Sequence, residues 1–374
     1  MVDRPWPLGQ AFEAMCADLH RSTVPTVCLG SDAPCGARRV SSAAFAREFV
    51  ACSRPAIIKG MLAEWPAMQK WQRSDYLFAS TASVTVALTP NGRADCITDA
   101  TFVNGGATQR ETLFVSACDV QMRVCDFRWR LHEALRARGP RQAKPFVVDT
   151  ADHSARYVPP VPYIQLQNNS MPLEFAHLLG DITDSVSCFG SDIFGVPPEA
   201  TNMWIGSSLS VSSMHQDWYE NLYGVVRGTK RFTLVAPWEA PRLPKVRARS
   251  ASFAYTLQEE KWRLSQSLNF PAAESSVLDD AGGPPPGWVD WIAVDLVDTP
   301  PLQWPVCTTN VRSVTVDVGP GDVLYLPAMW YHRVAQTESD DEGCVAAVNY
   351  WFDMNFEHPL ADIQAMLRKA AFSV

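Results

Sequence analysis

Short runs of alternating apolar and polar residues dominate the chain from Tyr163 onward. They read YIQLQ, MWIGSSLSVSS, ENLYGVVRGTKRFTLVAP, VRSVTVDVGPGDVLYLPAMWYHRVAQ and CVAAVNYWFDM, and Gly or Pro separates them. A period of two is typical of β-strands that bury one face. The series therefore predicts a sandwich or closed roll of antiparallel strands.

The first third of the chain instead shows mainly helical spacing, with breaks. The stretches PLGQAFEAMCADLHR and SSAAFAREFVACS place apolar residues at helical intervals, the second behind a Ser pair suited to capping. RPAIIKGML predicts a short buried strand that ends at Gly60, and SVTVAL predicts a strand before a hairpin-type turn at 90–92. We expect a further helix from Val120 to Arg138.

The late chain contains one long interruption and a terminal amphipathic pattern. The Pro- and Asp-rich segment near 278–305 holds three Trp, so we expect a packed loop inserted in the roll. The pattern PLADIQAMLRKAAF predicts a helix over 356–374, which could pair with a second copy in a homodimer. Without repeats or a linker, residues 1–374 are expected to form a single domain. Its parts would be an N-terminal wrap over about 1–140 and a core over about 160–355.

Composition narrows the classes of partner. The 374 residues are 47% apolar, enough for a large core, and the net charge is −8 with no run of five basic residues. Because phosphate binding requires a basic face, a nucleic acid is an unfavourable main partner.

The cysteines and the N-terminal residues bear on location. Ten cysteines lie without any C-x-x-C pair, which favours reduced, mostly buried thiols. We see no signal peptide and no apolar run long enough to cross a bilayer. We therefore expect a protein without a membrane partner, in the cytoplasm, the nucleus or both.

The motif His215-x-Asp217 is the first candidate for a metal site. Residues two apart on a strand point to the same face, so this pair can direct an imidazole and a carboxylate to one point. The pair alone also fits a solvent-exposed polar patch at a strand end. His332 follows a Pro-ended apolar strand 117 residues later, and only a folded sheet could bring it to the pair. Two His and one carboxylate form the facial triad of non-haem Fe(II) oxygenases.

These motifs carry a family resemblance. HQDWYENLYGVVRGTKRF, GPGDVLYLPAMWYHRV and VNYWFDM together resemble the jumonji-C oxygenases of the cupin superfamily. Within that family the chain is most similar to the small lysyl hydroxylases that act on developmentally regulated GTP-binding proteins. SRPAIIKGMLAEWPAMQKW and VTVALTPNGRAD extend the similarity over about 42–354. The resemblance implies a double-stranded β-helix (jelly roll), mainly β with helical additions at both ends. It also implies Fe(II), the co-substrates 2-oxoglutarate and O₂, and ascorbate as a supporting reductant.

The resemblance also assigns roles to residues. His215, Asp217 and His332 fall on the iron ligands, and Lys230 falls on the cation that holds the far carboxylate of 2-oxoglutarate. A fixed cation suits a dicarboxylate in a narrow roll. Four further residues fall on hydroxyl or amide positions of the family that lie near the co-substrate: Tyr163, Tyr223, Ser212 and Asn349. Each has a structural alternative: a solvated Lys, core aromatics, the neighbouring hydroxyl of Ser213, or strand packing.

The implied reaction is hydroxylation of a lysine side chain in a GTP-binding protein. Its ammonium would need an acidic or aromatic neighbour, for which Glu220, Asp353 and Trp218 are candidates. Three alternatives stay open: N-methyl-lysine demethylation, hydroxylation of a tRNA base, and a non-catalytic cupin that binds a partner protein. The target carbon and the oligomeric state do not follow from the sequence.

Overall fold

A computed structural model describes most of the chain. The described residues are 23–30, 36–104, 107–137, 146–149, 159–243, 245–256, 261–266, 286–298, 310–339, 343–357 and 362. The first predicted helix, before residue 23, and nearly all of the C-terminal helix lie outside these ranges, so the predicted dimer through that helix stays a prediction.

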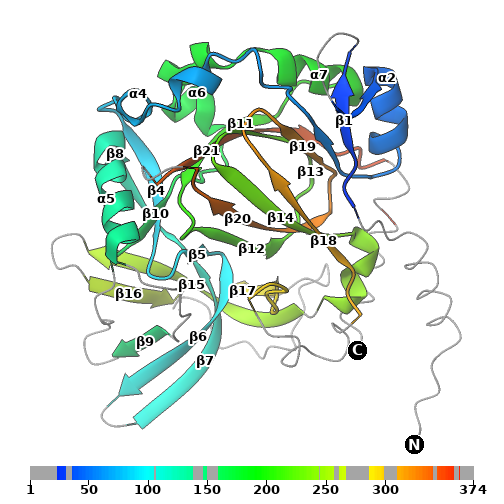
Figure 1. The fold of residues 1–374 in the computed structure, drawn as a ribbon. Helices are drawn as coiled ribbons and strands as arrows, with labels where there is room; N and C mark the ends of the chain where they lie inside the picture. The colour runs from blue at the N-terminus through cyan, green and yellow to red at the C-terminus, as the bar shows by residue number, and fades with distance from the viewer. Residues whose placement is uncertain are drawn as a thin grey trace, which may run out of the picture.

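Two facing sheets form the central roll (Figure 1). The larger has seven strands in the order β11-β21-β13-β19-β3-β1-β2, and the smaller has five in the order β18-β14-β20-β12-β5. Together their strands are β1 Thr26–Leu29, β2 Arg38–Val40, β3 Ala56–Ile58, β5 Arg93–Ala94, β11 Ala200–Gly206, β12 Val211–His215, β13 Tyr219–Arg227, β14 Thr229–Val235, β18 Ser313–Val318, β19 Val323–Leu326, β20 Tyr331–Thr337 and β21 Val345–Asp353. The predicted fold class, a mainly β cupin-type roll, is confirmed.

Two further sheets, of three and six strands, lie beside this roll (Figure 1). One has the order β10-β4-β8, and the other has the order β16-β15-β7-β6-β9, with β17 paired to β15. Their strands are β4 Ser83–Thr89, β6 Cys96–Asn104, β7 Ala107–Ser116, β8 Cys118–Arg123, β9 Phe146–Asp149, β10 Val161–Tyr163, β15 Lys245–Thr256, β16 Lys261–Gln266 and β17 Trp288–Ile292.

Short helices cover the outer side of the seven-stranded sheet, above β11, β21 and β19 in Figure 1. The described helices near this side are α2 Ser42–Phe45 with a π-helical continuation Ala46–Val50, α3 Ala67–Lys70, α4 Ser74–Leu77, α6 Ser170–Glu174, the 3-10 turn Ala176–Asp181 and α7 Ser185–Phe194. The longer α5 Val124–Ala137 instead lies beside β8 and β10, and a 3-10 turn at Pro237–Arg242 follows β14. The predicted capping of the second helix is confirmed, since the Ser41 hydroxyl accepts a hydrogen bond from Ala44 N.

Strand β21 shows how alternation separates the two layers of the core. Its even-numbered residues Ala346, Val348, Tyr350 and Phe352 pack in the cluster beneath the helices. The odd-numbered Ala347 packs in the cluster inside the roll, where Asn349 and Trp351 line a cavity. Because both faces of this strand are covered, its sequence is almost continuously apolar.

The N-terminal third contains more strand than predicted. The expected helix at Val120 begins only at Val124, because residues 118–123 continue as β8 paired with β4. The turn at 90–92 is also not a hairpin, since β4 and β5 belong to different sheets. At this turn Gly92 has φ +79°, and a Cβ would lie 1.8 Å from Leu209 O, so only glycine fits.

Two further expectations are corrected. The Pro-rich insert is not only a loop, because its described part contains β17, which pairs antiparallel with β15. The seven cysteines in the described ranges are not mostly buried reduced thiols. Cys28 is disulfide-bonded, and among the six described free cysteines Cys52, Cys125 and Cys188 are exposed.

None of the described helices combines the length and the apolar character needed to span a bilayer.

Candidate active site

A cavity of about 270 Å³ lies between the two sheets of the roll. The five-stranded sheet contributes imidazole and hydroxyl groups, and the seven-stranded sheet contributes amides and aromatic rings. The lining residues used below are Asp95, Tyr163, Trp204, Ser212, Ser213, His215, Asp217, Asn221, Tyr223, Phe232, Trp291, His332, Val334, Asn349 and Trp351.

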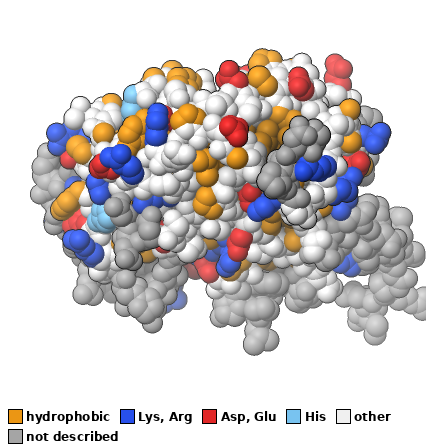
Figure 2. Space-filling model, turned by 45° about the horizontal axis from the view of Figure 1, so that its top comes forward, with side chains coloured by type: hydrophobic (Ala, Val, Ile, Leu, Met, Phe, Trp, Pro, Cys, Tyr) orange, Lys and Arg blue, Asp and Glu red, His pale blue; other side chains and the backbone are white. Residues whose placement is uncertain are grey.

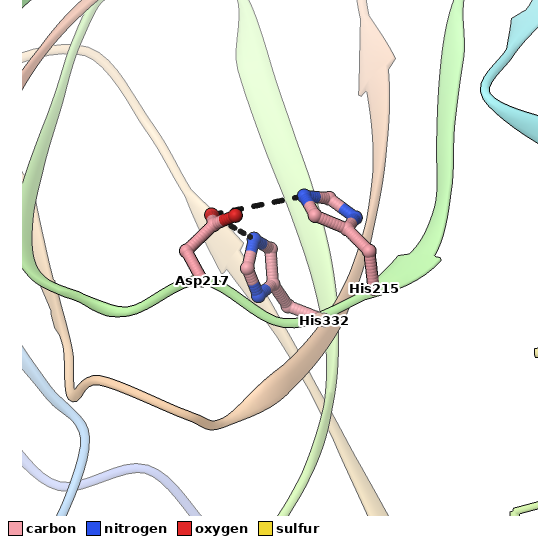
Figure 3. A group of neighbouring side chains, drawn as sticks. All are labelled: His215, Asp217 and His332. Carbon is pink, nitrogen blue, oxygen red and sulfur yellow. Dashed lines mark ion pairs between the residues drawn. The ribbon is translucent and has the colours of Figure 1, made fainter. Parts of the chain in front are cut away.

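Three potential metal ligands that line this cavity point toward one another (Figure 3). His215 and His332 are cross-strand partners on β12 and β20. Asp217 lies two residues past the end of β12, so the predicted placement of both motif residues on one strand is wrong. Its Oδ2 still lies 3.8 Å from His215 Nε2 and 3.4 Å from His332 Nε2. One ligand atom from each residue lies within 4.8 Å of the other two.

Backbone carbonyls orient both imidazole rings. Nδ1 of His215 lies 2.7 Å from Ser213 O, and Nδ1 of His332 lies 2.9 Å from Trp330 O. A carbonyl oxygen can only accept, so each Nδ1 donates its proton. In the neutral rings the Nε2 lone pairs then face Asp217, and such outer hydrogen bonds are typical of metal-binding histidines.

The charges of the cluster also suit a cation. Burial alone would raise the pKa of Asp217, but the neighbouring His215 and His332 outweigh it and lower that pKa to about 2. Burial, and then the nearby His332, lower the pKa of His215. At neutral pH the pKa values therefore favour one carboxylate anion and a neutral His215, the forms that bind a divalent metal.

The amino group of Lys230 is buried behind the cavity wall, in contact with the lining residue Tyr163. Lys230 is fully buried, and its Nζ donates to Tyr163 Oη at 3.1 Å and to Gln336 Oε1 at 2.5 Å. None of the ion pairs between described residues involves Lys230, and burial lowers its pKa to about 7. A Cβ on Gly206 would lie 2.6 Å from both the Tyr163 ring and Gln336 Nε2. The lysine therefore sits in a close-fitting recess, and no acid of the described ranges forms an ion pair with it.

The remaining predicted residues line the same cavity. Burial raises the pKa of the Tyr163 hydroxyl, which a hydrogen bond with Ser212 partly offsets. Burial also raises the pKa of Tyr223. Asn349 Nδ2 donates to Asn221 Oδ1 at 3.2 Å, and its Oδ1 accepts from Trp204 Nε1 at 2.8 Å. Seven of the eight sequence-predicted residues therefore line this cavity, and the eighth, Lys230, lies behind the wall and reaches the lining residue Tyr163 by a hydrogen bond.

Strand register explains this gathering. Across β14 and β20, Lys230 pairs with Gln336, Phe232 with Val334, and Leu234 with His332. The two ends of the site are therefore four residues apart on β20, about 13 Å of strand. Gln336 was missed from the sequence, although it shares the face of His332 by the period of two.

Among the residues that line the cavity, the sequence analysis also missed Asp95 and Trp291. Asp95 ends the stretch VTVALTPNGRAD, but no metal- or substrate-binding pattern surrounds it there, and Trp291 lies in the insert expected to be a loop. The predicted neighbours for a substrate ammonium are not in the cavity wall. Glu220 accepts hydrogen bonds from Tyr325 Oη and Ala328 N, Asp353 is exposed, and Trp218 is 43% exposed against Phe356.

The residues present fit a metal and a dicarboxylate. Two oriented imidazoles and one carboxylate occupy a single face, which leaves other coordination positions open. The recess of Lys230 supplies one buried positive charge without an acidic partner among the described residues. A β roll with these features defines the oxygenase class of cupins.

Comparisons with known proteins identify the family. A profile described as a cupin-like domain matches residues 42–358. The chain is 33% identical to "JmjC domain-containing protein E" of Dictyostelium discoideum over 83% of this chain and 81% of that protein. It is 30% identical to "Lysine-specific demethylase JMJ32" of Arabidopsis thaliana (87% and 84%) and to human "Bifunctional peptidase and (3S)-lysyl hydroxylase JMJD7" (84% and 81%). The chain belongs to the cupin-like JmjC family of 2-oxoglutarate-dependent dioxygenases.

Proposed function

We propose that this protein is an Fe(II)- and 2-oxoglutarate-dependent hydroxylase of a lysyl side chain in a protein substrate, expected to be a developmentally regulated GTP-binding protein. One observation carries the proposal: a His-Asp-His cluster lines the cavity, and Lys230, buried and without an ion pair among the described residues, lies behind its wall four residues along the ladder. The printed name of the human relative, a (3S)-lysyl hydroxylase, supports lysine as the target.

In this proposal His215, Asp217 and His332 would hold the iron, and Lys230 would hold the distal carboxylate of 2-oxoglutarate. The hydroxyls of Tyr163, Tyr223 and Ser212 and the amide of Asn349 would complete the co-substrate site. When bound, iron and 2-oxoglutarate use O₂ to hydroxylate an unactivated C–H bond, with release of succinate and CO₂. Ascorbate would keep the iron reduced.

The apolar side chains of the cavity would limit access of water. Phe232 and Val334 lie between the two ends of the site, on the strands that carry Lys230 and His332. Their rings and methyl groups separate the metal end from the cation without offering a competing ligand. A dry cavity also strengthens the attraction between Lys230 and a carboxylate.

Demethylation is the second candidate, because the Arabidopsis relative is named a lysine-specific demethylase. The same oxidation on an N-methyl group gives a hydroxymethyl amine that loses formaldehyde. Release of formaldehyde from a methylated peptide would therefore support demethylation, whereas a stable gain of one oxygen atom would support hydroxylation.

A nucleic-acid substrate has less support. The net charge is −8, and on the face shown in Figure 2 basic side chains are interspersed with acidic and apolar ones. A non-catalytic binding role would leave the oriented metal ligands unexplained. A protease role has no sequence motif of the G-x-S-x-G or H-E-x-x-H type.

The proposal is tested with purified protein, Fe(II), 2-oxoglutarate, ascorbate and a recombinant developmentally regulated GTP-binding protein. We expect a gain of one oxygen atom on a lysine, dependent on 2-oxoglutarate and abolished by His215→Ala. Succinate formed without a modified substrate would keep the oxygenase chemistry and reject this substrate. If metal-loaded protein forms neither succinate nor a modified substrate, the proposed function is contradicted.

A further inference from the structure

Asp95 brings a carboxylate into the wall of the cavity beside the metal-type cluster. It follows β5, whose Arg93 and Ala94 pair in parallel with Val211 and Ser212 of β12. Its backbone is left-handed, with φ 53°, and the Ser213 hydroxyl donates to its carbonyl at 2.5 Å. This corner between β5 and β6 places residue 95 next to the strand that carries His215.

The Asp95 carboxylate is without a cationic partner among the described residues. Asp95 and Asp217 are the acids that line the cavity, and Asp217 belongs to the metal-type cluster. Burial, and then the neighbouring Asp119, raise the pKa of Asp95 to about 6, and no positive charge opposes them. The adjacent Arg93 already pairs with Asp295 and Asp298. An incompletely solvated carboxylate of this kind favours a cation.

Aromatic rings line the same cavity. Trp291 lies parallel to the His215 ring, with centroids 6.4 Å apart, and its Nε1 donates to Ser213 Oγ at 3.2 Å. Ser213 thus links Trp291 to the backbone of Asp95. Trp351 also lines the cavity and stacks on Tyr219 at 4.7 Å. Flat apolar surfaces of this kind suit the methylene stem of a lysine, and an acid suits its ammonium.

We propose that Asp95 is the specificity residue of the site, and that its carboxylate receives the ammonium of the lysyl side chain packed against Trp291 and Trp351. This inference rests on the proposed function and deepens it, because it assigns the residue that selects lysine. It favours lysines that keep an N–H, since a trimethylated nitrogen cannot donate a hydrogen bond to the carboxylate.

An Asp at position 95 could also serve only to allow the left-handed backbone there, so the test must distinguish this structural role from substrate binding. Asp and Asn adopt left-handed backbone more readily than most residues. Asp95→Asn keeps this conformational tolerance and the size of the side chain, and removes only the charge. Asp353→Asn is the matched control, because it removes an acid that lies outside the cavity wall.

The experiment measures binding, so that it does not depend on turnover. Protein loaded with Zn(II) and 2-oxoglutarate is titrated by calorimetry with two probes, Nα-acetyl-lysine methylamide and Nα-acetyl-norleucine methylamide. The probes differ only in the ammonium group, which norleucine lacks. We expect wild-type protein and Asp353→Asn to prefer the lysine probe by about tenfold or more, the range of a charge-assisted hydrogen bond. Asp95→Asn should bind both probes equally.

Each outcome decides the inference. A lysine preference that survives in Asp95→Asn would overturn it, as would a wild-type protein that binds both probes equally. Uncoupled conversion of 2-oxoglutarate to succinate, measured in parallel with Fe(II), reports on the proposed function. If the lysine preference is lost in Asp95→Asn while this conversion persists, Asp95 acts on the substrate and not on the oxygenase chemistry.

Discussion

The protonation of Lys230 should control the binding of 2-oxoglutarate. In the protein alone its ammonium lies between Tyr163 Oη and Gln336 Oε1, and burial lowers its pKa to about 7. A carboxylate that binds there stabilises the charged form, so the complex must contain protonated Lys230. A lysine with this pKa is about half protonated at pH 7 and about 1% protonated at pH 9. The Kd should therefore weaken about fiftyfold between these pH values.

The same pKa predicts that the protein takes up protons when it binds 2-oxoglutarate. Above pH 7 the free protein has mostly neutral Lys230, so binding must take up a proton, about half of one at pH 7 and nearly a whole one at pH 9. Calorimetry of Zn(II)-loaded protein in buffers of different ionisation enthalpy measures both the Kd and the proton uptake. Zinc prevents turnover during the titration because it has no redox chemistry.

Two variants isolate the contribution of Lys230. Lys230→Met should bind 2-oxoglutarate weakly at every pH and without the slope, because it lacks a titrating group. Lys230→Arg stays charged at every pH, so its affinity should be nearly independent of pH even if the larger group fits less well. A wild-type Kd that is flat from pH 7 to pH 9, or a slope that Lys230→Met retains, would refute this argument.

Three more predictions address the metal, the insert and the turn. Asp217→Ala should weaken Mn(II) binding, measured by calorimetry, by more than about a hundredfold, since even outer-shell changes cost ten- to hundredfold; equal affinity would reject the ligand assignment. Asp295→Ala should lower the free energy of unfolding by about 3 kcal/mol, because it removes a partner of the buried Arg333, whereas Asp317→Ala, in an exposed pair, should cost under about 1 kcal/mol. Gly92→Ala should cost about 3 kcal/mol in urea unfolding, and Gly195→Ala about 1 kcal/mol, because both have positive φ but only Gly92 meets a backbone atom. Equal costs within either pair would contradict the corresponding packing argument.

The strands of the roll and their inward faces could be predicted from the sequence, because both depend on a period of two. The runs that contain Lys230, His332 and Asn349 form β14, β20 and β21, and they direct His332 and Asn349 into the cavity and Lys230 to the lining residue Tyr163. The hairpin β6–β7 was not expected in the mainly helical first third. Its inward positions include the buried Thr98, whose polarity hides the alternation.

Contacts between distant segments could not be predicted. Asp95 reaches the cavity only because β5, a strand of two residues, pairs with β12, and so short a strand leaves no periodic signal. Trp291 reaches it through pairing of β17 with β15, inside a segment whose prolines predict a loop. Asp217 joins His215 although it lies past the end of β12, so the rule that residues two apart on a strand share a face does not explain its position.

The two halves of the site therefore have different structural origins. The ladder of β14, β20 and β12 sets the spacing between Lys230 and the histidines, and a shift of one residue would turn all of these side chains away from the cavity. The wall that holds Asp95 and Trp291 comes from a strand corner and an insert beside the roll, which Arg93 and Arg333 connect through Asp295. Changes in this wall can alter which side chain binds without changing the register that positions metal and co-substrate. Substitutions at Asp95 and Trp291 should therefore affect substrate affinity first, and substitutions on the ladder should affect 2-oxoglutarate turnover first.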